Sequence, residues 1–179
     1  LFAGFLLCLP AGLLNTYVPP LIGLSDDDAF VAGFTEEPLK FLAFLMFVKT
    51  RKEFNEPMDA VVYGAMLSIG FATFENFEYV YLYEFDVAPV TVAVIRACTA
   101  VPLHICCGII MGYFLALGFY QPSFMNYSKA LSVPAFLHAT YNYIDAEVKM
   151  LAFMICIIGL TVFLHKQVRK LQTKEFKAD

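Results

Sequence analysis

Charge is scarce in this sequence. Asp, Glu, Lys and Arg together make up 16% of the 179 residues, and they sum to a net charge of −4. Nucleic-acid binding depends on Lys and Arg side chains that neutralise phosphates, so this balance gives no reason to expect nucleic acid as a partner. Internal repeats and low-complexity tracts are absent too, so neither a repeat array nor a flexible linker is expected.

Several familiar catalytic and metal-binding patterns are also missing. No His-Glu-x-x-His run occurs, which is the usual helical zinc signature. No serine or cysteine has a histidine partner at a motif spacing, so a covalent nucleophile is not expected. The cysteines lie inside apolar runs without zinc-finger spacing, and we interpret them as packing residues. They are Cys8, Cys98, Cys106, Cys107 and Cys156.

Hydrophobic residues, by contrast, fill 60% of the sequence, and its mean hydropathy is +0.68. A soluble domain of this length is about 45–50% apolar, so the excess indicates a lipid environment. A spanning helix needs ~20 mostly apolar residues, so we predict an all-α, polytopic transmembrane bundle of about six spans. Together they form one integral-membrane domain over residues 1–179. The predicted spans are 1–24, 34–48, 58–83, 87–119, 127–144 and 148–165, with a basic tail at 166–179.

Three of these spans are expected to be irregular. The first contains Pro10, Pro19 and Pro20 and begins inside an apolar run without a charged segment, so we interpret it as a trimmed span rather than a cleavable signal peptide. The second is short, which favours an irregular or re-entrant start. The fourth is long, which predicts a tilt or a bend at Pro102.

Cationic loops follow alternate spans, which predicts the orientation. One side carries Lys49, Arg51, Lys52, Lys129, Lys166, Arg169, Lys170, Lys174 and Lys177. The other side carries Asp26, Asp27, Asp28, Glu84, Asp86, Asp145 and Glu147, with Lys149 as its cation. Because Lys and Arg favour the cytoplasmic side, we predict a multi-pass protein of the cell membrane with both termini in the cytoplasm.

Small residues recur at helical spacing in two of the spans. Ala60, Gly64 and Ser68 form one set, and Gly108 and Gly112 form the other. Small side chains let helix backbones approach closely in lipid. We therefore interpret both sets as packing seams.

Polar side chains inside the predicted spans carry the functional argument. They are Glu36, Glu37, Lys40, Glu75, Asn76, Glu78, Arg96, His104, His138 and Asn142. A charge near the bilayer centre costs at least ~2.5–3.5 kcal/mol on insertion scales. A chain that only had to fold would lack most of these groups, so we predict that they form a functional site.

Helical spacing and depth bring these groups together. Glu36 and Lys40 share one helix face, as do His138 and Asn142. Glu75 and His138 each lie about eight residues, or ~12 Å, from the outer end of their span. The polar groups thus converge in the outer half of the membrane. Arg96 has a simpler interpretation as a structural ion-pair partner of Glu75 or Glu78.

At these residues the sequence resembles the PrsW family of intramembrane proteases, distantly related to the CAAX-processing and bacteriocin-processing membrane proteases. The matching stretches are Glu36-Glu37-Pro38-Leu39-Lys40, Phe71-Ala72-Thr73-Phe74-Glu75-Asn76, Arg96 through His104 to Gly108, and His138-Ala139-Thr140-Tyr141-Asn142. The CAAX branch usually carries a histidine where this sequence has Glu75, which favours the PrsW branch. The resemblance implies cleavage of a single-span membrane protein, typically an anti-sigma factor, near the extracytoplasmic face.

For catalysis we expect Glu36 or Glu37 to be the base that activates water. Lys40 would tune their charge, and His138 and Asn142 would stabilise the oxyanion or hold the water. His104 and Glu75 would complete the pocket, with Asn76 and Arg96 as tuning or substrate-binding groups. We expect no cofactor. The alternative is zinc, held by Glu36, Glu75, His104 and His138 with an open position for water.

Two other classes of function remain open. Intramembrane Glu and His also mark ion pathways, so the alternative from another class is a transporter or proton relay. The sequence lacks the two inverted halves with broken helices that many transporters carry. A non-catalytic scaffold is disfavoured because all four polar motifs are retained.

Overall fold

The chain folds entirely as helices over the residues described by the computed structural model, which are 1–25 and 28–175. The predicted loop residues Asp26 and Asp27 and the tail residue Lys177 lie outside them. The helices are α1 (Phe2–Leu21), η1 (Ala29–Val31), α2 (Ala32–Ala43), η2 (Phe44–Val48), α3 (Pro57–Tyr81), α4 (Pro89–Cys98), α5 (Ala100–Tyr120), α6 (Phe124–Tyr143) and α7 (Glu147–Glu175).

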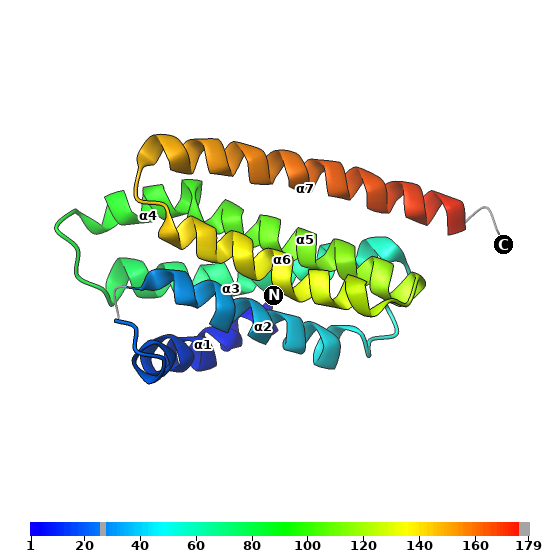
Figure 1. The fold of residues 1–179 in the computed structure, drawn as a ribbon, viewed down its shortest axis with the longest axis horizontal. Coiled ribbons are helices and arrows are strands. Elements are labelled where there is room, and N and C mark those ends of the chain that lie inside the picture. Colours follow the sequence, from blue (N-terminus) through cyan, green and yellow to red (C-terminus); the bar gives the residue numbers. More distant parts are fainter. Residues whose placement is uncertain (26–27, 176–179) are drawn as a thin grey trace.

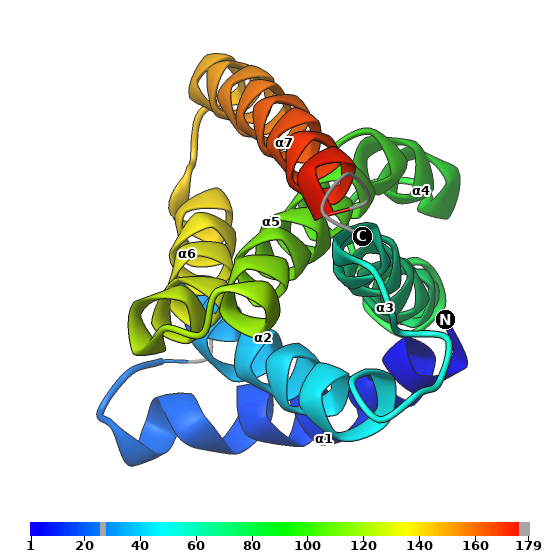
Figure 2. The same ribbon diagram turned by 90° about the vertical axis from the view of Figure 1, so that its right-hand side faces the viewer.

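Helix α5 occupies the centre of the bundle, with α2, α3, α6 and α7 arranged around it (Figure 2). It packs most closely against α3 and α6, and α2 packs against α6. These helices run along the long axis of the molecule (Figure 1), whereas α1 crosses the bundle beside α2 and α3. The region beside α5 that faces α2 is therefore walled by α2, α3 and α6, and α1 closes one side.

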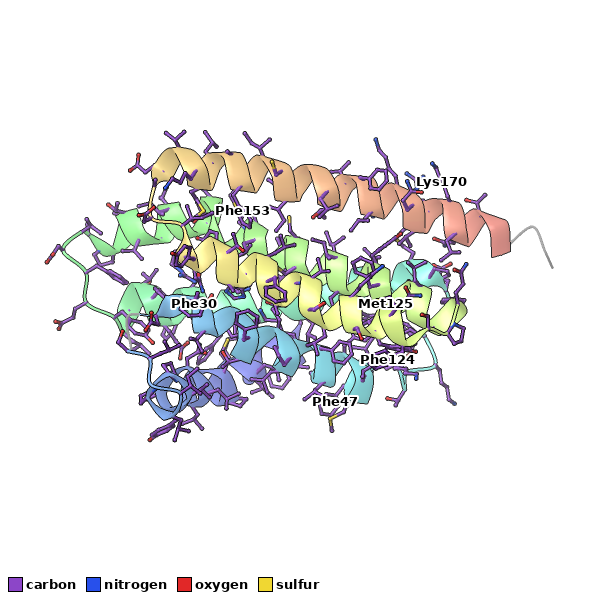
Figure 3. The ribbon with its side chains drawn as sticks, viewed as in Figure 1. Phe30, Phe47, Phe124, Met125, Phe153 and Lys170 are labelled. Atoms are coloured by element: carbon purple, nitrogen blue, oxygen red, sulfur yellow. The ribbon has the colours of Figure 1, made fainter. Side chains whose placement is uncertain are left out.

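Four of the described helical segments are long and apolar enough to cross a membrane: Phe2–Leu21, Pro57–Tyr81, Pro89–Tyr120 and Glu147–Thr173. Large apolar side chains also cover the outside, among them Phe47 and Leu151, which are 55% and 63% exposed. Phe30 and Lys170 mark opposite ends of the bundle in Figure 3. The protein is thus an all-α, multi-pass membrane bundle, as the composition predicts.

Helix α6 and the α2–η2 segment correspond to the other two predicted spans, 127–144 and 34–48. Neither meets that criterion of length and apolarity. Their sequences carry buried charged and polar residues, including Glu36, Glu37, Lys40 and His138. The short second span begins irregularly, as expected, because the 3-10 turn η1 precedes α2. It also ends irregularly, in the π-helical η2.

The predicted bend of the fourth span is wrong in its position. The helix breaks at Thr99, where φ is −125° and ψ is −66°, rather than at Pro102. Pro102 instead lies in the first turn of α5, where its missing N–H has no helical acceptor to lose. The last helix also differs from expectation, since α7 continues to Glu175, ten residues beyond the predicted end of the span.

The small-residue seams hold α3 and α5 together. A Cβ atom added to Gly108 would lie 2.4 Å from the carbonyl oxygen of Gly64, and one added to Gly64 would lie 2.3 Å from that of Gly108. The two helices run antiparallel, so beyond this contact His104, one turn from Gly108 on α5, meets Phe71, about two turns from Gly64 on α3, with ring centroids 5.5 Å apart. The predicted seam is confirmed, and it sets the distance between the helices at the polar cluster.

A second close approach positions α2 against α6. A Cβ atom at Gly33 would lie 2.4 Å from the backbone nitrogen of Ala139 and 2.6 Å from the carbonyl oxygen of Ala135. Glu37 follows Gly33 by one helical turn on the same face, and His138 immediately precedes Ala139. The glycine therefore brings the α2 carboxylates within reach of the α6 imidazole.

Candidate active site

The core of the site is a group of buried ionisable side chains around Lys40. The Lys40 ammonium lies 2.8 Å from Glu37 Oε1, 3.7 Å from Glu36 Oε2 and 3.0 Å from Nδ1 of His104. It also lies 4.0 Å from the centre of the Phe71 ring. No more than 2% of Glu36, Glu37, Lys40, His104 or His138 is exposed. Charges removed from solvent this completely must compensate one another.

A second group connects the cluster to α4. Arg96 donates from Nη2 to Glu75 Oε2 at 2.7 Å and from Nε to Asn76 Oδ1 at 2.8 Å, and its guanidinium stacks on the Tyr79 ring at 3.6 Å. The same Glu75 oxygen lies 2.8 Å from Nε2 of His104. Arg96 is therefore the ion-pair partner of Glu75, which confirms its interpretation from the sequence as a structural ion-pair residue. Glu75 joins the two groups.

The hydrogen-bond partners assign the histidine tautomers. An ammonium only donates, so Nδ1 of His104 accepts from Lys40 and its Nε2–H donates to Glu75. A carboxylate only accepts, so Nδ1–H of His138 donates to Glu37 Oε1, 3.1 Å away. In neutral His138 the lone pair then sits on Nε2. The His138 and His104 rings are perpendicular, with centroids 4.8 Å apart.

A cavity of about 370 Å³ opens beside this cluster between α1, α2, α3, α4, α5 and α6. Six of the predicted site residues line it: Glu36, Glu75, Arg96, His104, His138 and Asn142. Glu37, Lys40 and Asn76 do not line it, and they contact the lining residues from behind. The sequence could not distinguish the two neighbouring glutamates. In the structure Glu36 faces the cavity and Glu37 does not.

Asn142 differs from its expected arrangement. Its side-chain amide donates to the backbone carbonyl of Ala29 at 3.0 Å and so ties the end of α6 to η1. It borders the cavity, but this donor is already in use. His104 is the residue whose membrane depth, as estimated from the sequence, fits the cluster least well. It lies at the centre of the cluster because the helix breaks at Thr99.

Sequence reasoning missed three residues in and around the cluster. Asn15 of α1 donates from Nδ2 to Glu36 Oε1 at 3.0 Å, and the Thr35 hydroxyl donates to the Asn15 side-chain oxygen. The available signal was an amide within the apolar first span, the same kind of signal that identified Asn142. Tyr79, which stacks on Arg96, was hidden among the many aromatic residues of α3.

Three of these side chains could hold a metal ion. One ligand atom each from Glu36, His104 and His138 lies within 4.8 Å of the other two, and all three residues are buried. Glu36 Oε2 is buried without a hydrogen-bond partner among the described residues. A carboxylate and two imidazoles are ligands that zinc accepts. Glu75, the fourth residue of the predicted zinc set, lies outside this group and holds His104 and Arg96 instead.

Fold and site together define a multi-pass membrane protein with a buried carboxylate–imidazole centre at the wall of a cavity. Comparison with known families agrees: a family model described as "PrsW family intramembrane metalloprotease" matches residues 1–165. The chain belongs to the PrsW family of intramembrane proteases. No solved structure gave a significant match.

Curated relatives carry the same name. The chain is 31% identical over 166 residues to "Protease PrsW" of Bacillus subtilis (strain 168), covering 86% of this chain and 73% of that protein. It is 29% identical over 137 residues to the protein of that name from Clostridioides difficile (strain 630), covering 74% of this chain and 56% of that one. For the Geobacillus kaustophilus (strain HTA426) protein the identity is 33% over 120 residues, covering 65% and 51%. The chain thus spans about half to three quarters of these relatives.

Proposed function

We propose that this protein is an intramembrane endopeptidase that hydrolyses a peptide bond of a membrane-anchored protein with a water molecule activated by Glu36. The observation that carries the proposal is the environment of Glu36 Oε2. This atom and Glu37 Oε2 are both buried and unpartnered among the described residues, but of the two side chains it is Glu36 that lines the cavity and lies within metal-binding reach of two histidines. Leaving a carboxylate oxygen unpaired in such a place is costly, which favours a role that requires it free.

In this proposal Glu36 takes a proton from the attacking water and later delivers it to the leaving amine. His138 faces the cavity and, in the tautomer set by Glu37, presents a lone pair on Nε2 that can orient the water. Arg96 uses Nε and Nη2 for Asn76 and Glu75, and its remaining N–H groups can donate to the carbonyl oxygen as negative charge develops there.

Glu37 and Lys40 behind the cavity wall, together with Glu75 in the wall, hold this arrangement. Glu37 accepts hydrogen bonds from both Lys40 and His138 and so fixes the ring orientation of His138. Glu75 does the same for His104 and Arg96. We therefore assign Glu37, Lys40 and Glu75 to positioning and charge balance rather than to the base.

The donor set also fits a metal ion, and as the second form of this mechanism we propose that Glu36, His104 and His138 hold one, with zinc as the best match. Glu36 would then be a ligand, and the ion would take over its part in activating the water. Bound there, the ion would supply Lewis acidity toward the scissile carbonyl and the attacking water. Ligation by His104 would replace one of its two hydrogen bonds, to Lys40 or to Glu75. The family description as a metalloprotease supports this choice over the metal-free mechanism favoured by sequence alone.

The proposed substrate is a single-span membrane protein of the anti-sigma-factor type. Helical peptide bonds are shielded by their own hydrogen bonds, and exposing them in lipid costs several kcal/mol each. The cut should therefore fall where the substrate helix can unwind, at or just outside the extracytoplasmic end of its transmembrane span. This position assumes the orientation proposed from the Lys and Arg distribution, with both termini cytoplasmic. Membership of a protease family favours this activity over the transporter alternative.

Metal removal tests the proposal. The reconstituted protein, depleted with a membrane-permeant chelator and verified by elemental analysis, should cleave a single-span substrate at least 100-fold more slowly. One equivalent of Zn²⁺ should restore the rate. A fully metal-free sample that cleaves as fast as the untreated protein would contradict the metal assignment, and the metal-free water mechanism would then stand.

A further inference from the structure

Helix α1 contributes one polar contact to the cluster, and it falls on the residue proposed as the base. Asn15 donates from Nδ2 to Glu36 Oε1 at 3.0 Å, and its Oδ1 faces the hydroxyl of Thr35. Asn15 belongs to α1, whereas Thr35 and Glu36 are neighbours on α2. Two helices are thus connected through one carboxylate.

The chemistry of the partners fixes the direction of every hydrogen bond in this set. A carboxylate only accepts, so the amide NH₂ of Asn15, and not its oxygen, must face Glu36. The amide oxygen then faces Thr35, which must donate its single hydroxyl proton to it. The carbonyls of Val31 and Ala32, 3.4 and 3.1 Å from the hydroxyl, compete for the same proton.

This set of bonds makes the two oxygens of Glu36 unequal. Oε1 is held by Asn15, while Oε2 lies 3.7 Å from Lys40 Nζ and 3.9 Å from Nδ1 of His138, too far for hydrogen bonds. Without Asn15, the carboxylate could rotate to bring an oxygen within hydrogen-bonding distance of Lys40, with which it now forms only a longer ion pair. Held as it is, Glu36 keeps Oε2 free beside the cavity.

We propose that Asn15, oriented by Thr35, is a positioning residue for Glu36, so that α1 is a functional part of the active site. The inference rests on the proposed function, in which Glu36 is the reacting carboxylate. Contacts of α1 elsewhere support a fixed placement: Cys8 Sγ lies 3.2 Å from the carbonyl oxygen of Phe71, and Ala11 is buried.

Substitutions at Asn15 and Thr35 test the inference in the full-length protein. Asn15→Ala should lower kcat by roughly 10–100-fold, the usual effect of removing an outer-shell partner, with little change in KM. Thr35→Val should cause a similar loss, and Thr35→Ser, which keeps the hydroxyl, should stay near wild type. Because the two side chains act as one unit, the double variant Asn15→Ala/Thr35→Val should be no slower than Asn15→Ala. Matched controls are Asn126→Ala, at a half-buried position away from the site, and Thr73→Val, at an exposed position on α3.

A second readout does not depend on cleavage. The affinity of the metal-depleted protein for Zn²⁺, measured by competition with a fluorescent chelator, should fall roughly 10–100-fold in Asn15→Ala and in Thr35→Val but not in Thr35→Ser. Wild-type kcat and wild-type Zn²⁺ affinity in both Asn15→Ala and Thr35→Val would overturn the inference. Equal losses of kcat and Zn²⁺ affinity in Thr35→Val and Thr35→Ser would also overturn it. If Asn15→Ala fails to fold, the comparison of these two Thr35 variants decides the test. Absence of cleavage by the wild-type protein would instead count against the proposed function, while the Zn²⁺ comparison would still report on Asn15.

Discussion

Glu36→Gln should slow peptide-bond cleavage by roughly 10²–10⁴-fold, the range that a general base contributes. Gln has nearly the same shape as Glu, and its side-chain oxygen can still accept the hydrogen bond that Asn15 donates to Oε1. What it loses is the basic oxygen at the Oε2 position, which can neither take a proton from water nor ligate a metal in the same way. The measurement is single-turnover cleavage of a labelled single-span substrate in proteoliposomes.

The neighbouring glutamate makes this test sharper. Glu37→Gln removes the negative charge that pairs with Lys40 and strengthens the hydrogen bond from His138, but it leaves the cavity-facing carboxylate in place. Its loss should therefore be the smaller one, roughly 10–100-fold. Glu84→Gln, at an exposed position outside the site, should cleave at the wild-type rate. Full activity in Glu36→Gln together with none in Glu37→Gln would exchange the roles assigned to the two residues.

Lys40→Met should destabilise the fold by about 3–5 kcal/mol, because removing one partner of a buried ion pair leaves uncompensated charge. Lys40 is fully buried, and it is the cation that lies within 4 Å of both Glu36 and Glu37. For a chain of this length the expected drop in the apparent Tm is roughly 10 °C. Thermal unfolding followed by far-UV circular dichroism in detergent measures it.

A double variant separates charge balance from packing. Adding Glu37→Gln to Lys40→Met removes the nearer negative charge, 2.8 Å from Nζ, and should restore part of the lost Tm. Lys52→Met, at an exposed position on the loop between η2 and α3, should leave the Tm unchanged. If the double variant melts no higher than Lys40→Met, the loss comes from packing and the proposed charge balance is wrong.

The membrane fold could be predicted because the burial of apolar side chains in lipid drives it, and the apolar side chains are visible in the composition. Runs of apolar residues define the helices, and the small residues at Gly64 and Gly108 already mark where α3 and α5 approach. The position of the break in the fourth span was not predictable. Pro102 is the obvious helix breaker, but a proline in the first turn of a helix loses no hydrogen bond, so the break falls at Thr99 instead.

The candidate site was predictable to a similar depth. A charged residue in lipid is expensive wherever it occurs, so Glu36, Lys40, His104 and His138 could be found from their surroundings alone. Their pairing could not be found, because it depends on which rotamer each side chain adopts between helices that are distant in sequence. The distinction between Glu36 and Glu37 arises from this pairing, as does the contact of Asn15 with Glu36.

Mass spectrometry of the cleavage products tests the central claim most directly. The wild-type protein, reconstituted with a single-span substrate, should release one dominant fragment, cut at or just outside the extracytoplasmic end of the substrate's transmembrane span. Glu36→Gln should release no fragment above background. A cut on the cytoplasmic side of the substrate's span, or the same fragment produced at the wild-type rate by Glu36→Gln, would contradict the account.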